Sequence, residues 1–406
     1  EINYRDWSSD VCSSDLRTVC GADGTGRMKV LYFTRDYTPH DVRFLNAIAA
    51  LGHEGYFLRL CDEKRGLDGR GLPGGIRAVD WRWGTSIVSP ADYPRVAADL
   101  KAVAAELRPD VLHSGPLPDV SYIAALAELR PHVAMSWGFD LNHDIYVDPA
   151  QRERAVFALE NADWFLGDCY TELESAVALG YPKDRATIFP WGIDPKRFSP
   201  GPSAVRGGIA PPEDFLMLSL RSLEPNYRVD TTIRAFLKAG AEDAAIQLMV
   251  LADGSERAAL KALAETAPAD VRRRIHWFGR KPYDELVDYY RAADLYLSSS
   301  ITDGSSVSLL EAMGCGLPVL VSDIPGNLEW VDDGKSGFLF PVGDSDAMAE
   351  RMLFLSRRRT TLRPIGASAR LRIESEADWS RNIRKITEAY ASAIRHAAGL
   401  SAGNAG

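Results

Sequence analysis

Residues 298–323 read SSSITDGSSVSLLEAMGCGLPVLVSD, and this stretch decides the fold. An apolar strand ends near Ser298, a small polar loop follows, and a helix is expected from about Ser306 to Gly314. The Gly-Cys-Gly that closes the helix is typical of a C-cap, and the apolar run after it predicts the next buried strand. A loop that leads into a helix N-terminus offers backbone N–H groups and the positive end of the helix dipole, which suit a phosphate.

Two acids accompany this loop. Asp303 lies at its entrance, and Glu311 lies one to two turns into the helix, where it can point back toward a hydroxyl-bearing group such as ribose. The alternative is that Asp303 and Ser305 cap the helix and that Glu311 is a solvated helical acid. The spacing of this segment alone does not separate the two interpretations.

Outward from this segment, short apolar runs alternate with helical stretches along the whole chain. Such alternation predicts parallel sheets that are covered on both faces by helices. The runs form two series, and each series predicts one Rossmann-like domain. Strands are expected at 28–33, 110–113, 132–136 and 164–166 in the first series, and at 215–220, 246–251, 275–278, 295–297 and 318–321 in the second.

The segment between the two series is a linker. Residues 190–202 read PWGIDPKRFSPGP, with four prolines and two glycines, a composition that excludes the interior of a helix or strand. We therefore expect an N-terminal domain over 28–195 and a C-terminal domain over 203–372. Ligands of open α/β sheets bind outside the carboxyl ends of the strands, so the cleft between the domains is the expected site. An amphipathic helix is predicted over 377–398.

The first 27 residues are treated separately. They are polar, lack the apolar stretch of a secretory signal, and contain RDWSSDVCSSDL, which looks like a translated sequencing-adapter fragment. We expect residues 1–27 to be a non-native, disordered leader and Met28 to be the natural start. The glycines of this leader precede any strand, so they do not form a phosphate loop.

Charge and cysteine usage exclude several classes of protein. The formal net charge of −9 argues against binding to nucleic acid, and no apolar run approaches the roughly 20 residues that span a bilayer. The five cysteines form no Cys-x-x-Cys pair, so a reduced, cytoplasmic protein is expected. Peripheral contact with the inner face of a membrane stays open.

The loop–helix segment resembles the nucleotide-sugar motif of glycosyltransferase family 4, the retaining group 1 enzymes of the GT-B fold, in which two acids separated by seven residues flank a Gly-containing loop. The resemblance covers 28–396 and is strongest over 214–345. It continues, in the family's order, through LADGSE (251–256), IHWFGR (275–280), YRAADL (290–295), IPGNLE (324–329), GKSGFL (334–339) and PVGD (341–344).

This resemblance implies an architecture and an activity. The architecture is α/β: two Rossmann-like domains with a cleft between them and a C-terminal helix that crosses back to the N-terminal domain. The activity is transfer, with retention, of a sugar from a UDP- or GDP-linked donor to a glycan, a lipid-linked sugar or a small molecule. Two alternatives stay open: a catalytically inactive nucleotide-sugar-binding partner protein, and a GT-B-like sugar-nucleotide epimerase.

The resemblance also implies roles for individual residues. Asp303 occupies the position of an acid that contacts the donor sugar and is glutamate in most relatives, and Glu311 matches the acid that binds ribose. Arg221 matches a diphosphate-binding arginine, so Arg221 and Asp303 are the expected catalytic residues. Relatives carry a lysine where Tyr227 stands, and either the neighbouring Arg228 substitutes for it or Tyr227 supplies a neutral hydrogen bond. The other expected donor contacts are Arg228, Phe278, Gly279, Arg280, Gly304, Ser305, Ser306 and Val307.

The N-terminal half supplies the expected cleft and acceptor residues. The loop after the first strand lacks the glycines of relatives, so its side chains should line the cleft, and Trp137 stands where many members carry a histidine. The expected residues are Asp36, Tyr37, His40, Trp137 and Asp140. No general base is assigned, because in a retaining transfer the departing phosphate oxygen can accept the acceptor's proton.

No metal or other cofactor is expected. The Asp-x-Asp pair of metal-dependent sugar transferases has one counterpart in the second half of the sequence, Asp344-Ser-Asp346, and its position before a helical run indicates a helix cap.

Overall fold

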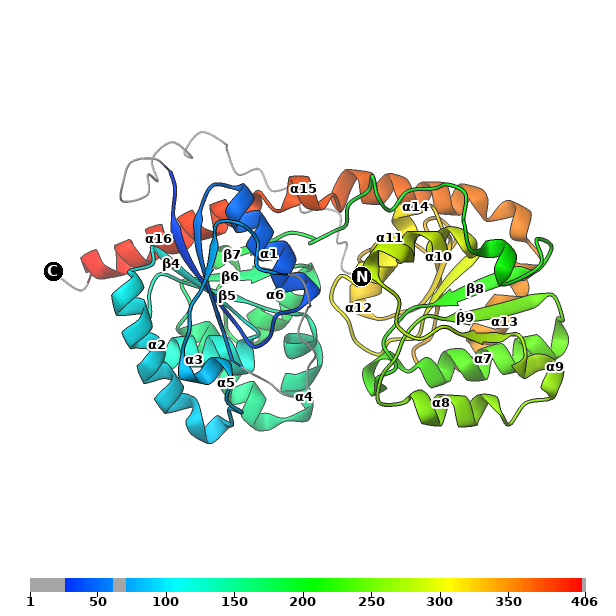
Figure 1. The fold of residues 1–406 in the computed structure, drawn as a ribbon, viewed down its shortest axis with the longest axis horizontal. Coiled ribbons are helices and arrows are strands. Elements are labelled where there is room, and N and C mark those ends of the chain that lie inside the picture. The colour runs from blue at the N-terminus through cyan, green and yellow to red at the C-terminus, as the bar shows by residue number, and fades with distance from the viewer. Residues whose placement is uncertain (1–25, 61–70, 404–406) are drawn as a thin grey trace. The chain divides into compact units, whose positions relative to one another are not determined.

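The computed structural model describes residues 26–60 and 71–403, so the disorder predicted for the leader falls almost wholly outside the described residues. Contacts divide the chain into two compact units. Unit 1 runs to Phe189 and also contains the residues from Ile383 onward, and unit 2 is Pro190–Asn382. Each unit is a parallel sheet between layers of helices (Figure 1).

Unit 1 contains a seven-stranded sheet with the order β3-β2-β1-β4-β5-β6-β7, in which all neighbours are parallel. Its strands are β1 (Lys29–Thr34), β2 (Glu54–Arg59), β3 (Ile76–Ala78), β4 (Val111–Gly115), β5 (His132–Met135), β6 (Trp164–Gly167) and β7 (Ala186–Ile188). Its α-helices are α1 (Pro39–Ala50), α2 (Tyr93–Leu107), α3 (Tyr122–Leu126), α4 (Ile145–Val147), α5 (Pro149–Glu160), α6 (Tyr170–Ala178) and α16 (Lys385–Gly403). The order reverses between β1 and β4, so the loops after these two strands diverge at one edge of the sheet.

Unit 2 repeats this arrangement with a six-stranded parallel sheet of order β10-β9-β8-β11-β12-β13. Its strands are β8 (Phe215–Ser219), β9 (Ile246–Val250), β10 (Ile275–Trp277), β11 (Leu295–Ser298), β12 (Val319–Ser322) and β13 (Phe338–Phe340). Its α-helices are α7 (Val229–Glu242), α8 (Arg257–Ala264), α9 (Ala269–Arg272), α10 (Leu286–Ala292), α11 (Val307–Gly314), α12 (Pro325–Leu328), α13 (Ser345–Ser356), α14 (Arg363–Glu376) and α15 (Trp379–Asn382). The order reverses between β8 and β11.

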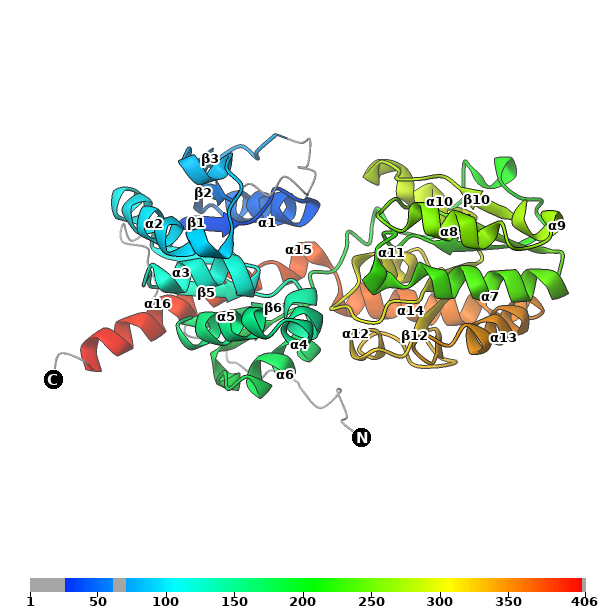
Figure 2. The ribbon, with the colours of Figure 1, turned by 90° about the horizontal axis from the view of Figure 1, so that it is seen from below.

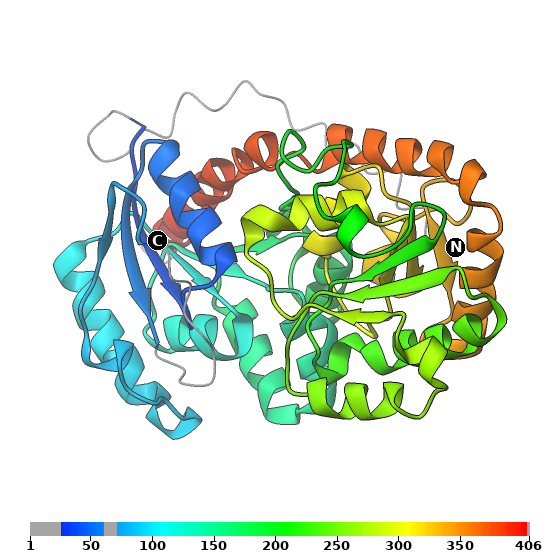
Figure 3. The same ribbon diagram turned by 45° about the vertical axis from the view of Figure 1, so that its right-hand side comes forward.

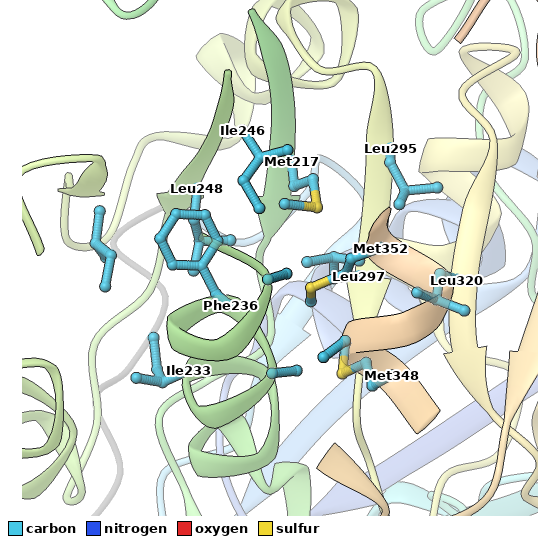
Figure 4. Close-up of a cluster of buried hydrophobic side chains, with 14 of the residues drawn as sticks. Met217, Ile233, Phe236, Ile246, Leu248, Leu295, Leu297, Leu320, Met348 and Met352 are labelled. Carbon is cyan, nitrogen blue, oxygen red and sulfur yellow. The ribbon is translucent and has the colours of Figure 1, made fainter. Parts of the chain in front are cut away.

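Alternate residues of each strand in unit 2 enter two different cores. Phe215 and Met217 of β8 face α7, α8 and α13, whereas Leu216 and Leu218 face α10, α11 and α14. Figure 4 shows the first core, where Met217 and Leu297 lie near Met348 and Met352 of α13. Helices cover both faces of the sheet (Figure 3). Because both faces are buried, the strands are continuously apolar, which is why the sequence shows runs rather than alternation.

The structure has strands that the sequence analysis did not anticipate. These are β2, β3, β7 and β13, of which β3, β7 and β13 are edge strands of three residues each. The nine predicted strands are confirmed within one to two residues at each end.

The single helix predicted over 377–398 is instead two helices, α15 and α16. The break follows Asn382, whose side chain donates to the carbonyl oxygens of Pro190 (2.9 Å) and Glu376 (2.7 Å). Helix α16 lies against β4, β5, β6 and β7 of unit 1 (Figures 1 and 2). It is 19 residues long, and neither it nor any other helix over the described ranges is long and apolar enough to cross a membrane.

Buried histidines of unit 1 fix α16 on the sheet. Tyr390 is fully buried, and its hydroxyl makes a 2.9 Å hydrogen bond with Nδ1 of His113 on β4. His53, which precedes β2, bonds through Nε2 to the hydroxyl of Thr387 at 3.1 Å. Burial lowers the pKa of His113 to about 3, and nearby His132 adds to this shift, so the imidazole is neutral at pH 7.

Replacing Tyr390 with Phe removes the hydroxyl that bonds to His113 and leaves a buried imidazole nitrogen without that partner. We expect the free energy of unfolding to fall by about 1–2 kcal/mol, the usual cost of an unmet buried hydrogen bond. Urea unfolding followed by circular dichroism measures this change. Tyr146→Phe is the control, because Tyr146 is 67% exposed, and it should leave stability unchanged. Equal stability of both variants would show that the His113–Tyr390 bond does not hold α16.

Candidate functional site

The candidate site lies where the strand order of unit 2 reverses. β8 and β11 are neighbours, with Ser219 opposite Leu297, and the chain leaves both strands at the same edge of the sheet. The loop after β8 carries Arg221, and the loop after β11 carries Asp303. Helix α11 follows this second loop directly, so its N-terminus lies at the same edge. Crevices at such reversals are the usual ligand sites of open α/β sheets.

Arg221 is held on several sides. Its Nη2 lies 2.7 Å from Oδ2 of Asp303, and its Nη1 donates to the hydroxyl oxygens of Ser306 and, at 3.1 Å, Ser308. The guanidinium carbon lies 4.1 Å from the ring centroid of Tyr227, a cation–π arrangement. The two ion-pair side chains are 11% and 19% exposed, so most of this pair is removed from water.

The charges of this pair influence each other. Burial by itself lowers the pKa of the Arg221 guanidinium, but the Asp303 carboxylate outweighs it and raises that pKa above its usual value. Burial raises the pKa of Asp303, and the charge of Arg221 offsets only part of the shift. The arginine is therefore permanently charged, whereas the acid takes up a proton more readily than an exposed aspartate.

Helix α11 begins at this pair. Its N-cap residue is Ser306, whose side chain makes no capping bond to the helix. Ser306 instead accepts from Arg221, and Ser305 accepts a 3.1 Å hydrogen bond from the indole N–H of Trp330. Gly304, which precedes these two serines, is buried. The serine side chains are thus used to hold the loop and the arginine.

Glu311 is not a solvated helical acid, so that alternative is wrong. Its side chain lies on the buried face of α11, with 3% of the residue exposed, and its Oε2 accepts a 2.8 Å hydrogen bond from the hydroxyl of Tyr290 on α10. Burial raises the pKa of Tyr290 well above its usual value, and the Glu311 charge adds to the shift. Tyr290 therefore stays protonated and donates to the carboxylate.

The structure separates Tyr227 from Arg228. The ring of Tyr227 lies against Arg221, whereas Arg228 pairs with Asp230 at 2.9 Å and its side chain is 41% exposed. Arg228 has a backbone φ of 44°, in the left-handed region, where it precedes the first turn of α7. The aromatic ring of Tyr227, where the resemblance implies a lysine, therefore supports Arg221.

The predicted base-contacting segment follows β10. Phe278 continues the sheet through its N–H, which bonds to the carbonyl of Val250 at 3.0 Å, and its ring packs edge-on against Tyr289. Gly279 has φ 69°, a backbone conformation in which a residue with a side chain would be strained. Arg280 is exposed, and the ammonium of Lys281 lies 5.7 Å from the Phe278 ring.

The residues predicted in the N-terminal half lie in unit 1. Asp36 and Tyr37 follow β1 and are buried, and the Tyr37 hydroxyl donates to the carbonyl of Gly71. His40 and Trp137 make an edge-to-face contact, with ring centroids 5.3 Å apart. Burial lowers the pKa of His40 to about 3, and Arg43 adds to the shift, so His40 is neutral.

Asp140 is held by hydrogen bonds to neighbouring groups of the protein. It is fully buried, and its carboxylate accepts from the Ser136 hydroxyl (2.6 Å) and from the backbone N–H groups of Leu117 (3.0 Å), Trp137 (3.0 Å) and Leu141 (3.1 Å). The bond from Leu117 ties the loop after β5 to the loop after β4, and the other three hold the loop after β5 itself. The Asp140 carboxylate therefore already accepts hydrogen bonds from the protein's own groups.

Sequence reasoning missed the partners of the predicted residues. Tyr290 and Trp330 hold Glu311 and Ser305, and Tyr296 bonds to Ser308 at 2.8 Å. Ser308 was detectable, because it lies two positions after Ser306, in the first turn of α11. The aromatic residues carry no such signal, since their place depends on the packing of α10 and the strands.

The chain is similar to known proteins over the region that contains the candidate site. Residues 206–372, which contain it, match the family model for glycosyl transferases group 1. The chain is 28% identical over 218 residues to the amylovoran biosynthesis glycosyltransferase AmsK of Erwinia amylovora. This alignment covers 52% of each protein. It is 28% identical over 268 residues to the D-inositol 3-phosphate glycosyltransferase of Nocardia farcinica. This alignment covers 63% of this chain and 58% of that protein. The chain thus spans about half the length of these curated relatives.

Solved structures establish the fold. Alr3699/HepE from Anabaena, in complex with UDP and glucose, has a TM-score of 0.73 at 18% identity, with 89% of this chain and 99% of that one covered. Sucrose-phosphate synthase from Thermosynechococcus elongatus has a TM-score of 0.73 at 18% identity, with 90% and 98% covered. The two-domain α/β GT-B fold predicted from the sequence is confirmed.

A double-mutant cycle tests whether Arg221 and Asp303 form an energetically coupled pair. Arg221→Gln leaves Asp303 largely buried without its cation, and we expect a loss of about 1–3 kcal/mol in unfolding free energy. Adding Asp303→Asn should restore part of this loss, with a coupling energy of about 0.5–3 kcal/mol. Urea unfolding of the four proteins gives the cycle.

The matched control is the same cycle on Lys238 and Asp346, an ion pair whose side chains are 49% and 72% exposed. Its coupling should stay below about 1 kcal/mol because water screens the charges. Similar coupling energies in the two cycles would show that the Arg221–Asp303 pair is no more than an ordinary surface contact.

Proposed function

We propose that the protein is a glycosyltransferase that moves a sugar from a nucleoside-diphosphate donor to an acceptor hydroxyl, with retention of configuration and without a bound metal. The observation that carries this proposal is the cluster of Arg221, Asp303 and Glu311 around the N-terminus of α11. Each element of a nucleotide sugar has a chemically suited group in it. The family match over residues 206–372 supports the same activity.

The diphosphate lies against Arg221 and the first turn of α11. A guanidinium binds two phosphate oxygens at once, and the helix N-terminus adds partial positive charge. Both are fixed before the substrate arrives, because Tyr227, Ser306 and Ser308 hold the arginine. Fixed positive charge stabilises the diphosphate most as it departs, when its negative charge is greatest.

The nucleoside lies beside the carboxyl ends of β10 and β11. Glu311 accepts from the ribose hydroxyls, with Tyr290 holding its other oxygen. The peptide groups from Phe278 to Lys281 form the edge that meets the base. The relative that binds UDP, Anabaena Alr3699/HepE, supports a nucleoside diphosphate as the ligand of this fold.

Catalysis in this proposal depends on positioning and charge. The acceptor hydroxyl attacks from the face that the diphosphate leaves, and the departing phosphate oxygen takes its proton, so no side chain serves as base. Acceptors are a glycan, a lipid-linked sugar or a small molecule. We place the activity in the cytoplasm because the five cysteines of the sequence form no Cys-x-x-Cys pair.

The experiment is a thermal-shift screen with UDP, GDP, ADP and their sugars, followed by transfer assays with the best donor and trial acceptors. We expect one nucleoside diphosphate to stabilise the protein and its sugar to be transferred. Consumption of the donor at the same sustained rate with and without acceptor would contradict a transferase. Binding without turnover on any acceptor would favour an inactive partner protein.

Glu311→Gln tests the nucleoside position. The amide still accepts from Tyr290 but loses the charge, so affinity for the nucleoside diphosphate should fall about 10-fold to 100-fold, as expected for a hydrogen bond to a charged group. The 2′,3′-dideoxy analogue should bind both proteins equally, which calorimetry measures. Glu350→Gln, on the exposed face of α13, is the control and should bind like the unchanged protein. An equal loss for both ligands would place Glu311 away from the ribose.

A further inference from the structure

The guanidinium that a diphosphate would contact in this site is already paired with a carboxylate. Arg221 is the cation at the reversal point, and Asp303 lies 2.7 Å from it. Glu311 is a second carboxylate on the adjacent helix, so the three groups sum to one negative charge. Tyr290 and Tyr296 also face this cluster and stay neutral, because burial raises the pKa of both hydroxyls.

The neighbouring arginines Arg228 and Arg257 do not change this balance. Arg228 is paired with Asp230 at 2.9 Å, and Arg257 is paired with Asp253. Lys281 lies over the rings of Phe278 and Tyr289, outside the contacts of Arg221. A diphosphate brings about two further negative charges, so its contact with Arg221 competes directly with the Asp303 carboxylate.

The backbone around Asp303 is fixed. A Cβ at Gly326 would lie 2.6 Å from the carbonyl oxygens of Asp303 and Gly304, so α12 packs directly on this loop. Ser305 is held by Trp330, and the N–H of Ile301 bonds to the carbonyl of Asn226 at 3.0 Å. Because this backbone is fixed, the carboxylate leaves Arg221 by rotation of its own side chain, which also gives up its hydrogen bonds with Ser306 and Gly304.

We propose that Asp303 is an internal counter-ion that occupies Arg221 in the absence of donor and is displaced from it by the donor's diphosphate. Asp303 then sets the affinity for every nucleoside diphosphate by competition, in addition to any contact with the sugar. The carboxylate keeps Arg221 oriented between donors and lowers the affinity for the released nucleoside diphosphate. This inference rests on the proposed function, because it requires a diphosphate at Arg221.

The test compares the binding of UDP, GDP, their sugar nucleotides and uridine to the full chain and to Asp303→Asn by calorimetry. Asparagine has the same shape and no charge, so the nucleoside diphosphate that the unchanged protein binds should bind the variant about 10-fold to 100-fold more tightly. Uridine, which carries no phosphate, should bind both proteins equally. Asp346→Asn, which removes an exposed acid paired with Lys238, should behave like the unchanged protein.

The outcomes separate this inference from the proposed function. Equal or weaker binding of the nucleoside diphosphate by Asp303→Asn would overturn the counter-ion role and leave a binding function intact. A loss confined to the sugar nucleotide would also overturn it, since Asp303 would then act on the sugar alone. Absence of nucleoside diphosphate binding in both proteins would overturn both proposals. Asp303→Ser, which also removes the charge, serves as the second variant and must give the same direction of change.

Discussion

The reversal of strand order between β8 and β11 is the constraint on which the site depends. In a parallel sheet every strand ends at the same edge, and only at a reversal do two neighbouring loops turn away from each other and leave room. The loops after β8 and β11 carry Arg221 and Asp303, and the reversal brings these distant residues within 2.7 Å. Covered faces on both sides of the sheet make the position of both loops rigid.

The charged groups of the site are partly buried among apolar helices. Glu311 lies in the core that α10, α11 and α14 form with the sheet, where an ionised carboxylate is costly unless it is hydrogen-bonded. The Tyr290 hydroxyl offsets part of this cost, and Tyr296 and Ser308 do the same for the arginine side of the cluster. Groups held in this way lose little freedom when a ligand binds, which is the basis of preorganised electrostatics.

The sequence predicted the sheets and the charged residues, and it failed on their partners. Apolar runs bounded by turns identified most strands of both sheets, the motif around 298–323 led to Asp303 and Glu311, and the family resemblance led to Arg221. Tyr290 was out of reach because its bond to Glu311 depends on how α10 packs beside α11. The break between α15 and α16 was missed for a similar reason: the Asn382 side chain bonds to the carbonyl of Pro190, which is remote in sequence.

Both units have an arginine paired with an aspartate at the point where the strand order reverses. The two aspartates differ in the number of cations beside them. In unit 1, Arg35 after β1 pairs with Asp119 after β4, and Asp119 also accepts from Tyr93 at 2.7 Å and lies 4.0 Å from Arg154. Asp119 thus has two cations and a hydroxyl as partners, whereas Asp303 in unit 2 shares its one arginine with Ser306 and Ser308. Removing Asp119 from its partners would break its contacts with two cations, whereas turning Asp303 away breaks one ion pair and its hydrogen bonds with Ser306 and Gly304. The same fold can therefore use an arginine–aspartate pair as a permanent tie in one unit and as an exchangeable contact in the other.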